Sequence, residues 1–181
     1  MLKQAMKAGI PVLAMILLAA CGGGSSNAEK ENTAAHEEHA TTAPAVPVKL
    51  KDEKVNGIYQ HYVHLTTALI NADSAEAKVA GTAIAESAKE LTNAGAIADN
   101  AQKIAAASTL AAQRELYALL SNDVITLVKS SGLSSGELYV DYCPMANNDK
   151  GANWLSAAKD IKNPYFGDDM LTCGEVQETI K

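Results

Sequence analysis

The stretch from Leu138 to Ile180 reads LYVDYCPMANNDKGANWLSAAKDIKNPYFGDDMLTCGEVQETI. It holds the single Trp and the single Phe of the chain, three of its six Tyr, and the two Cys residues that follow Cys21. The residues that precede it, from about 50 onward, are rich in alanine and contain neither Cys nor Trp. Aromatic rings, sulfur atoms and glycines are thus concentrated in one segment, which predicts a helical scaffold that carries one specialised site.

The part of the chain before this stretch has a helical period. One apolar stripe recurs at spacings of three and four residues and consists of Val55, Ile58, Tyr62, Leu65 and Leu69. Asp73 and Ser74 are expected to end this first helix and to cap a second over about 75–92. A third helix is predicted from about Ile97, and a fourth from Thr109 to Gly132. The third and fourth could also form one long kinked helix.

After Gly136 the period becomes two. Alternation over Leu138–Cys143 predicts a short strand, which Pro144 ends because it cannot donate to a ladder. The sequence predicts a helical turn or two over Trp154–Ile161. A second strand over Thr172–Ile180 would pair with the first and bring Cys173 towards Cys143.

The start of the chain has the features of an export signal. Lys3 and Lys7 precede a short apolar run that ends in Leu-Ala-Ala-Cys at Cys21, the pattern of a bacterial lipoprotein signal. We therefore expect Cys21 to be lipidated. Gly22 follows it, and the absence of aspartate there favours anchoring at the periplasmic face of the outer membrane.

These observations predict a signal peptide over 1–20, a lipidated and disordered tether over 21–52, and a single domain over 53–181. The fold class is mainly α: a small antiparallel bundle of three to four helices over 53–132. A tail over 138–181, rich in aromatic residues, Cys and Met, contains one or two short strands. The formal net charge is −6 with no basic cluster, which argues against nucleic acid as a partner and leaves the lipid as the membrane contact.

Four sulfur-bearing residues in the tail could form a metal site. Cys143, Met145, Met170 and Cys173 form a soft ligand set that suits Cu(I). Two remaining cysteines in an exported protein also predict a Cys143–Cys173 disulfide, in which case the methionines would fill the core. Free thiols are the third alternative.

Other polar groups are weaker candidates. The histidine pairs His36 with His39 and His61 with His64 could each hold a metal ion, but the first lies in the acidic tether and the second lacks a nearby carboxylate on its own helix. The tail contains no His for a Cys–His nucleophilic pair, and Asp168-Asp169 is typical of a solvated turn. We therefore expect a protein that is not an enzyme.

The chain resembles an uncharacterised family of bacterial exported domains. The resemblance in the tail rests on Tyr142-Cys143-Pro144-Met145-Ala146, Gly151-Ala152, Trp154-Leu155-Ser156, Asn163-Pro164-Tyr165-Phe166-Gly167, Met170-Leu171 and Cys173-Gly174. In the helical part it rests on Tyr62, Leu69, Asp73, Gln113-Arg114 and Leu120-Ser121. Members occur as lone lipoproteins and as domains appended to periplasmic adaptor subunits of heavy-metal efflux pumps. The resemblance implies metal handling, with copper as the metal and efflux components as partners.

The tail also resembles, in part, a small heavy-metal-binding domain with the pattern Tyr-x-Cys-Pro-Met-His-Pro and a later Cys-x-x-Cys-Gly-Met. This chain departs from that pattern at Ala146, which replaces the His, and at Met170, which replaces a Cys. Exchange of Cys for Met preserves the soft character of the position.

The sequence thus leaves two functions open. The first is a lipoprotein that binds or passes a soft metal ion in connection with heavy-metal efflux or resistance. The alternative is a non-enzymatic interaction or structural module with a Cys143–Cys173 disulfide and no metal. In that module Trp154, Tyr165 and Phe166 would form either core or a docking surface.

Overall fold

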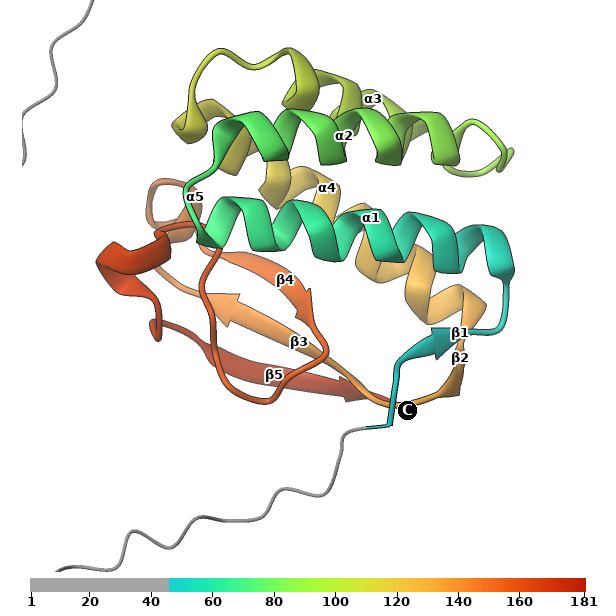
Figure 1. The fold of residues 1–181 in the computed structure, drawn as a ribbon. Coiled ribbons are helices and arrows are strands. Elements are labelled where there is room, and N and C mark those ends of the chain that lie inside the picture. Colours follow the sequence, from blue (N-terminus) through green and yellow to red (C-terminus); the bar gives the residue numbers. More distant parts are fainter. Residues whose placement is uncertain (1–45) are drawn as a thin grey trace, which may run out of the picture. The chain divides into compact units, whose positions relative to one another are not determined.

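The computed structural model describes residues 46–181, and the predicted signal peptide, the lipidation site Cys21 and the histidines His36 and His39 lie outside this range. The fold is mainly α with short antiparallel strands, as expected. Its four long helices are α1 (Glu53–Ile70), α2 (Ser74–Ala88), α3 (Gly95–Ala106) and α4 (Leu110–Ser131). Successive helices pack side by side as an antiparallel bundle (Figure 1). Among residues 46–181, no helix is both long and apolar enough to cross a bilayer.

Polar side chains begin three of the helices, and the sequence predicts two of these caps, those of α2 and α4. Asp52 accepts hydrogen bonds from two backbone N–H groups at the start of α1, and Asp73 does the same for α2. Thr109 accepts one from Ala112 at the start of α4, so α3 and α4 are separate helices. α2 ends at Ala88, earlier than predicted, because the chain leaves the helix through a series of turns before α3.

The tail forms a three-stranded antiparallel sheet. β3 (Leu138–Cys143) lies between β4 (Ala152–Ser156) and β5 (Glu175–Ile180). The predicted pairing of the first and last strands is confirmed. The predicted helical turn at Trp154 is wrong, because that residue lies in β4 and pairs with β3, and the tail therefore has three strands rather than one or two. Pairing along a central strand outweighs the local helix propensity of the alanines that follow.

A second, two-stranded sheet closes the start of the domain. β1 (Lys49–Leu50) pairs with β2 (Leu133–Ser135), and the side chain of Leu50 is only 1% exposed. The folded domain therefore includes β1, which lies before residue 53, the start expected from the sequence. The turn into β3 lies against the same segment, since a Cβ on Gly136 would be 2.8 Å from the Cα of Val48.

The three-stranded sheet is covered on both faces. Val140 and Leu155 are paired and lie on one face, where both belong to the hydrophobic core shared with the helices. Asp141, Cys143 and Trp154 lie on the other face by strand alternation. The segment between β4 and the short 3₁₀ helix η1 (Gly167–Met170) crosses the sheet (Figure 1). All five of these side chains are buried.

A group of buried aromatic and hydroxyl side chains joins the helices to the sheet. The rings of Tyr62 and Tyr117 stack with centroids 5.4 Å apart, and Tyr165 lies 5.5 Å from Tyr117. The Tyr62 hydroxyl accepts hydrogen bonds from Tyr117 and from the backbone N–H of Leu155, and it is 2.8 Å from Ser121 Oγ. This network fixes β4 against α1 and α4.

Candidate functional site

The two cysteines of the tail lie in contact. Cys143 is the last residue of β3 and is fully buried, whereas Cys173 is half-buried in the turn between η1 and β5. Their Sγ atoms are 3.6 Å apart, although 30 residues separate them in the chain. The approach predicted from strand pairing is thus present, and both residues are free thiols in the structure.

The backbone of Cys173 is held on both sides. Its N–H donates to the carbonyl of Met170 at 3.0 Å, and its carbonyl accepts from Asn163 Nδ2 at 2.8 Å. The Asn163 side chain is itself fixed, because its Oδ1 accepts from the N–H of Tyr165 at 2.8 Å. The turn at Asn163-Pro164, called the Asn-Pro turn below, therefore positions the half-buried thiol of Cys173.

Gly174 allows the chain to pass close to the single Trp. A Cβ at this position would be 2.9 Å from Trp154 Cη2 and 2.9 Å from the carbonyl oxygen of Tyr142, and the residue has φ +141°. Only glycine fits both the contact and the backbone angle. The Trp154 ring, 1% exposed, therefore packs beside the residue that follows Cys173.

The thiol pair has an electrostatic property that bears on ligand binding. The hydrogen bond with Cys143 raises the pKa of the Cys173 thiol, and burial and the charge of Cys143 raise it further. The raised pKa keeps Cys173 protonated at neutral pH in the absence of a cation. A metal ion must displace the proton, so metal binding at this pair would release protons.

The two methionines of the predicted ligand set differ in their exposure to solvent. Met145 is 46% exposed, and Met170 lies at the end of η1. In residues 46–181 the two thiols are in hydrogen-bonding contact with each other. Over the same residues, no three His, Cys, Asp or Glu side chains are grouped so that they could hold a metal ion.

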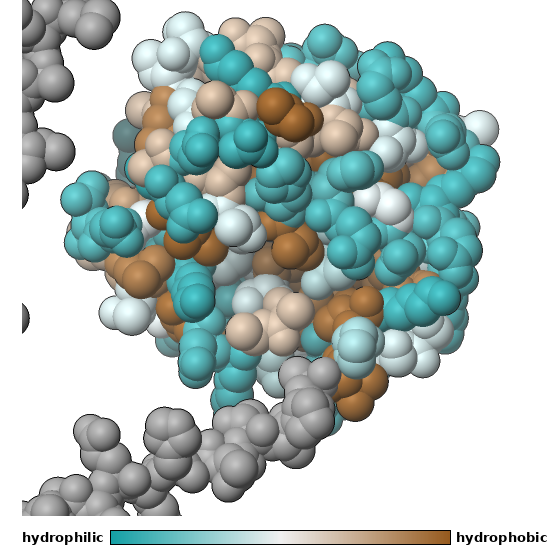
Figure 2. Space-filling view, in the orientation of Figure 1, coloured by the Kyte–Doolittle hydropathy of each residue, from teal (hydrophilic) through white to brown (hydrophobic). Residues whose placement is uncertain are grey.

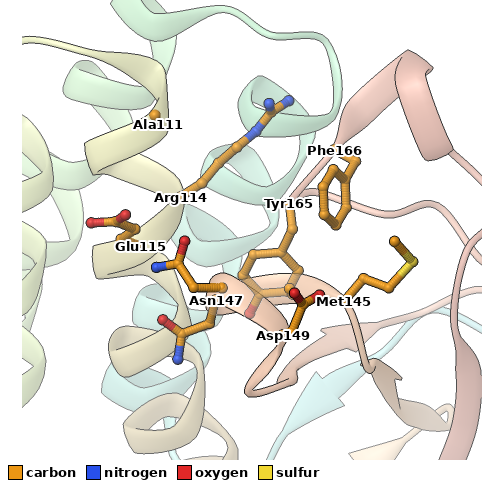
Figure 3. Close-up of a pocket in the computed structure, with 10 residues that line it drawn as sticks. Ala111, Arg114, Glu115, Met145, Asn147, Asp149, Tyr165 and Phe166 are labelled. Atoms are coloured by element: carbon orange, nitrogen blue, oxygen red, sulfur yellow. The ribbon is translucent and has the colours of Figure 1, made fainter.

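Met145 borders a pocket of about 420 Å³. In Figure 3, Arg114 and Glu115 come from α4, Tyr165 and Phe166 from the Asn-Pro turn, and Asn147 and Asp149 from the turn after β3. The lining also contains Ala111, Ala146 and Asn148. It combines an aromatic wall with charged groups of both signs and thus does not point to one class of ligand.

The turn beside this pocket has an unusual backbone. The short element α5 (Ala146–Asp149) contains three successive left-handed residues: Asn147, Asn148 and Asp149 have φ values of 54°, 56° and 60°. Asn and Asp adopt this conformation more readily than other side chains.

Arg114 links this region to α1, a role that the sequence analysis did not identify. Its Nε donates to the carbonyl of Pro164 at 2.9 Å, and an Nη donates to the carbonyl of Leu69 at 3.0 Å. Burial lowers the pKa of this guanidinium, and the nearby Asp169 raises it. The resemblance at Gln113-Arg114 was the available signal, and the structure shows that Arg114 ties the Asn-Pro turn to the bundle.

A buried carboxyl on the cysteine face of the sheet was also missed. Asp141 is 0% exposed, and neither of its side-chain oxygens has a hydrogen-bond partner. Burial raises its pKa from 3.8 to about 7. Strand alternation places Asp141 on the face of Cys143, but the pattern alone does not reveal that this face is covered.

The other polar candidates lie at the surface. His64 Nε2 is 2.9 Å from Glu76 Oε2 of α2, in an exposed hydrogen bond. Asp168 and Asp169 are exposed on η1, as expected for a solvated turn. Of the aromatic group offered as a docking surface, Trp154 and Tyr165 are buried in the core, so that interpretation is wrong for both.

The helical part of the chain matches a described family. The family "Protein of unknown function (DUF3347)" matches residues 58–136, which run from α1 through β2. The three-stranded sheet and the cysteine pair lie outside the matched residues. No curated protein and no solved structure matches the chain.

Proposed function

We propose that this protein is an exported lipoprotein that binds a soft metal ion, Cu(I), through Cys143 and Cys173. The observation that carries the proposal is the contact of the two thiols at 3.6 Å. Thiolate is the ligand that soft metal ions prefer, and the pair combines a buried sulfur with one that solvent reaches.

The spacing of the sulfur atoms fits a shared ion. A tetrahedral ion with bonds of about 2.3 Å to sulfur separates two thiolates by about 3.8 Å. The observed separation of 3.6 Å is close to this value, so the ion needs little rearrangement of the backbone. The fixed backbone of Cys173 supports the same conclusion, because a preformed pair loses less conformational entropy on binding.

Met145 and Met170 are the candidates for a further ligand. Each lies within three residues of a cysteine in the sequence, and a neutral thioether adds soft character without charge. The contribution of either methionine is expected to be smaller than that of a thiolate, which brings charge as well. The proposed link to heavy-metal efflux, with efflux components as partners, rests on the sequence resemblance. The proposed role is to bind or pass the ion rather than to catalyse a reaction.

A competition titration tests the proposal. The full-length chain with Cys21→Ser, which removes the lipid and the third thiol, is reduced and titrated without oxygen against a chromogenic Cu(I) chelator. We expect one Cu(I) per chain. Cys143→Ser and Cys173→Ser should each weaken binding by at least about tenfold, and Met145→Leu or Met170→Leu by less. Affinity should rise with pH, because binding releases the proton that Cys173 holds.

Equal Cu(I) affinity of the parent chain and the double Cys→Ser variant would overturn the proposal. The second candidate, a disulfide-stapled module without metal, would then be favoured. The same 3.6 Å contact and the buried Trp154 beside it are the observations that support that candidate.

A further inference from the structure

The two thiols differ in their access to solvent. Cys143 ends a central strand and is fully buried, whereas Cys173 lies half-buried in a turn. A dissolved molecule can therefore reach Cys173 more readily than the buried Cys143. Such an arrangement of one accessible and one buried thiol favours ordered, two-step chemistry.

The sulfur atoms can bond without a change of fold. A disulfide requires them to approach from 3.6 Å to about 2.05 Å. The backbone is held on one side by the pairing of Cys143 with Ala152, and on the other by the hydrogen bonds of Cys173 with Met170 and Asn163. Rotation of the side chains is the available movement, so the bond can form and break within the folded domain.

We propose that Cys143 and Cys173 form a reversible dithiol–disulfide couple that exchanges with an external disulfide, with Cys173 as the first sulfur to react. The oxidised pair has no thiolate to offer, so oxidation closes the metal site. This second statement rests on the proposed function, whereas the exchange does not.

The reaction balances as a thiol–disulfide exchange. Cys173 first loses its proton to solvent, a step that its raised pKa slows at neutral pH. The thiolate then attacks one sulfur of the external disulfide, a mixed disulfide forms, and one thiolate leaves. The Cys143 thiolate then attacks Cys173 Sγ, and the second thiolate leaves. Two electrons pass from the cysteines to the external disulfide, and the two protons of the cysteines pass to the departing thiolates.

Trp154 provides a built-in reporter of this state. It is the single Trp of the chain, and its ring packs against the backbone of Gly174, next to Cys173. Disulfides quench indole fluorescence at short range. Oxidation of the pair should therefore lower the emission of Trp154, and reduction should restore it.

The experiment uses the full-length Cys21→Ser chain and mixtures of oxidised and reduced glutathione. An alkylating agent blocks the free thiols and stops the exchange, and the intact mass of each sample is measured by mass spectrometry. The fluorescence of Trp154 is recorded on the same mixtures. We expect the parent chain to lose both alkylation sites together and to regain them as the mixture becomes reducing. Cys143→Ser should accumulate a glutathione adduct at Cys173, at least about tenfold faster than Cys173→Ser does at Cys143.

Three outcomes would overturn the inference: no intramolecular disulfide at any glutathione ratio, a bond that no ratio reduces in the folded chain, or equal adduct rates in the two variants. Circular dichroism checks that each variant is folded, and an unfolded variant is replaced by its Cys→Ala counterpart. Cu(I) titration of both redox forms separates the two proposals. Exchange without Cu(I) binding by the reduced form removes only the metal function, and Cu(I) binding without exchange removes only this inference.

Discussion

Asp141 is the residue whose environment differs most from what its chemistry requires. An ionised carboxylate without a hydrogen bond is costly to bury, and Asp141 has neither solvent nor a polar partner. With a pKa of about 7, the side chain holds its proton in the folded protein at mildly acidic pH. The unfolded chain loses that proton near pH 4, so the two states differ in protonation between about pH 4 and 7.

This difference predicts the pH dependence of stability. The folded state binds more protons than the unfolded state over that range, so the free energy of unfolding falls as pH rises from about 4 to 7 and then levels off. The loss from this group amounts to about 4 kcal/mol at most. Asp141→Asn should stabilise the metal-free protein by about 1–3 kcal/mol at pH 8 and by little at pH 4.5, because the amide is also unpaired.

Urea unfolding at several pH values measures this effect. Asp168→Asn is the matched control, since Asp168 is exposed and its replacement should change the free energy of unfolding by less than about 0.5 kcal/mol at either pH. A gain for Asp141→Asn that is the same at pH 4.5 and pH 8 would contradict the assignment of a raised pKa.

For the individual residues of the site, the sequence allowed some positions to be predicted and not others. The approach of Cys143 and Cys173 followed from the alternation in β3 and the antiparallel return of the last strand. The burial of Asp141 could not be predicted, because it depends on a covering segment with no regular period. The place of Met145 depends on the left-handed turn that follows it, which sequence spacing does not reveal.

The strand β4 shows how an element can depend on contacts from outside its own sheet. It lies at the edge of the sheet, and its outward backbone groups would otherwise be unpaired. The N–H of Leu155 donates to the Tyr62 hydroxyl at 3.1 Å, and the carbonyl of Asn153 accepts from the Tyr165 hydroxyl at 2.6 Å. Two phenol groups from distant parts of the chain thus satisfy this edge.

Removal of one hydroxyl tests this arrangement. Tyr62→Phe leaves the N–H of Leu155 buried without an acceptor and should lower the free energy of unfolding by about 1–3 kcal/mol. The amide of Leu155 should also exchange with deuterium faster. Tyr139→Phe is the control: its hydroxyl contacts only Glu137 at the surface, and the loss should stay below about 0.5 kcal/mol. Equal losses in the two variants would show that the edge contact contributes nothing.

The helices could be predicted well because their signals are local. Asp73 and Thr109 cap the expected helices, and Gly132 follows the last residue of α4. β4 could not be recognised, because its five residues are too few to establish a period and alanines follow it. β1, with two residues, exists only through its pairing with β2 at a distance of more than 80 residues.

Within the whole domain, the first strand, β1, and the thiol pair lie at opposite ends of β3. Val48 and β1 lie beside Gly136, just before β3 begins, and Cys143 is the last residue of β3. A strand of this length spans about 20 Å. β1 therefore lies at the opposite end of β3 from the proposed metal site, and Figure 1 shows β1 and the arrowhead of β3 well apart.

The proposed anchor has a test at this scale. Cys21→Ser should abolish acylation, and the protein should move from the membrane fraction to the soluble fraction. Cys143→Ser is the control, because it alters a thiol in the domain and should leave the protein with the membranes. A Cys21→Ser protein that remains membrane-bound until detergent is added would contradict the lipoprotein assignment.

The exposed apolar side chains of the domain are scattered on the face that Figure 2 shows. On the face shown in Figure 2, apolar residues form small separate groups among polar ones. The larger exposed apolar side chains of the described residues are Val46, Val63, Val79, Leu119 and Met145.

The hydroxyl groups of Tyr62 and Tyr165, which bond to the edge of β4, also limit how copies of the protein could assemble. A sheet with two free edges can add a further molecule at each end, and repetition of that step produces a fibre without a defined size. Here the β4 edge is occupied by hydroxyl groups of the same chain, which leaves β5 as the open edge of the three-stranded sheet. Pairing of that edge with a second copy would end the series at two molecules. The tyrosines that bond to β4 thus also prevent the sheet from growing into a fibre through that edge.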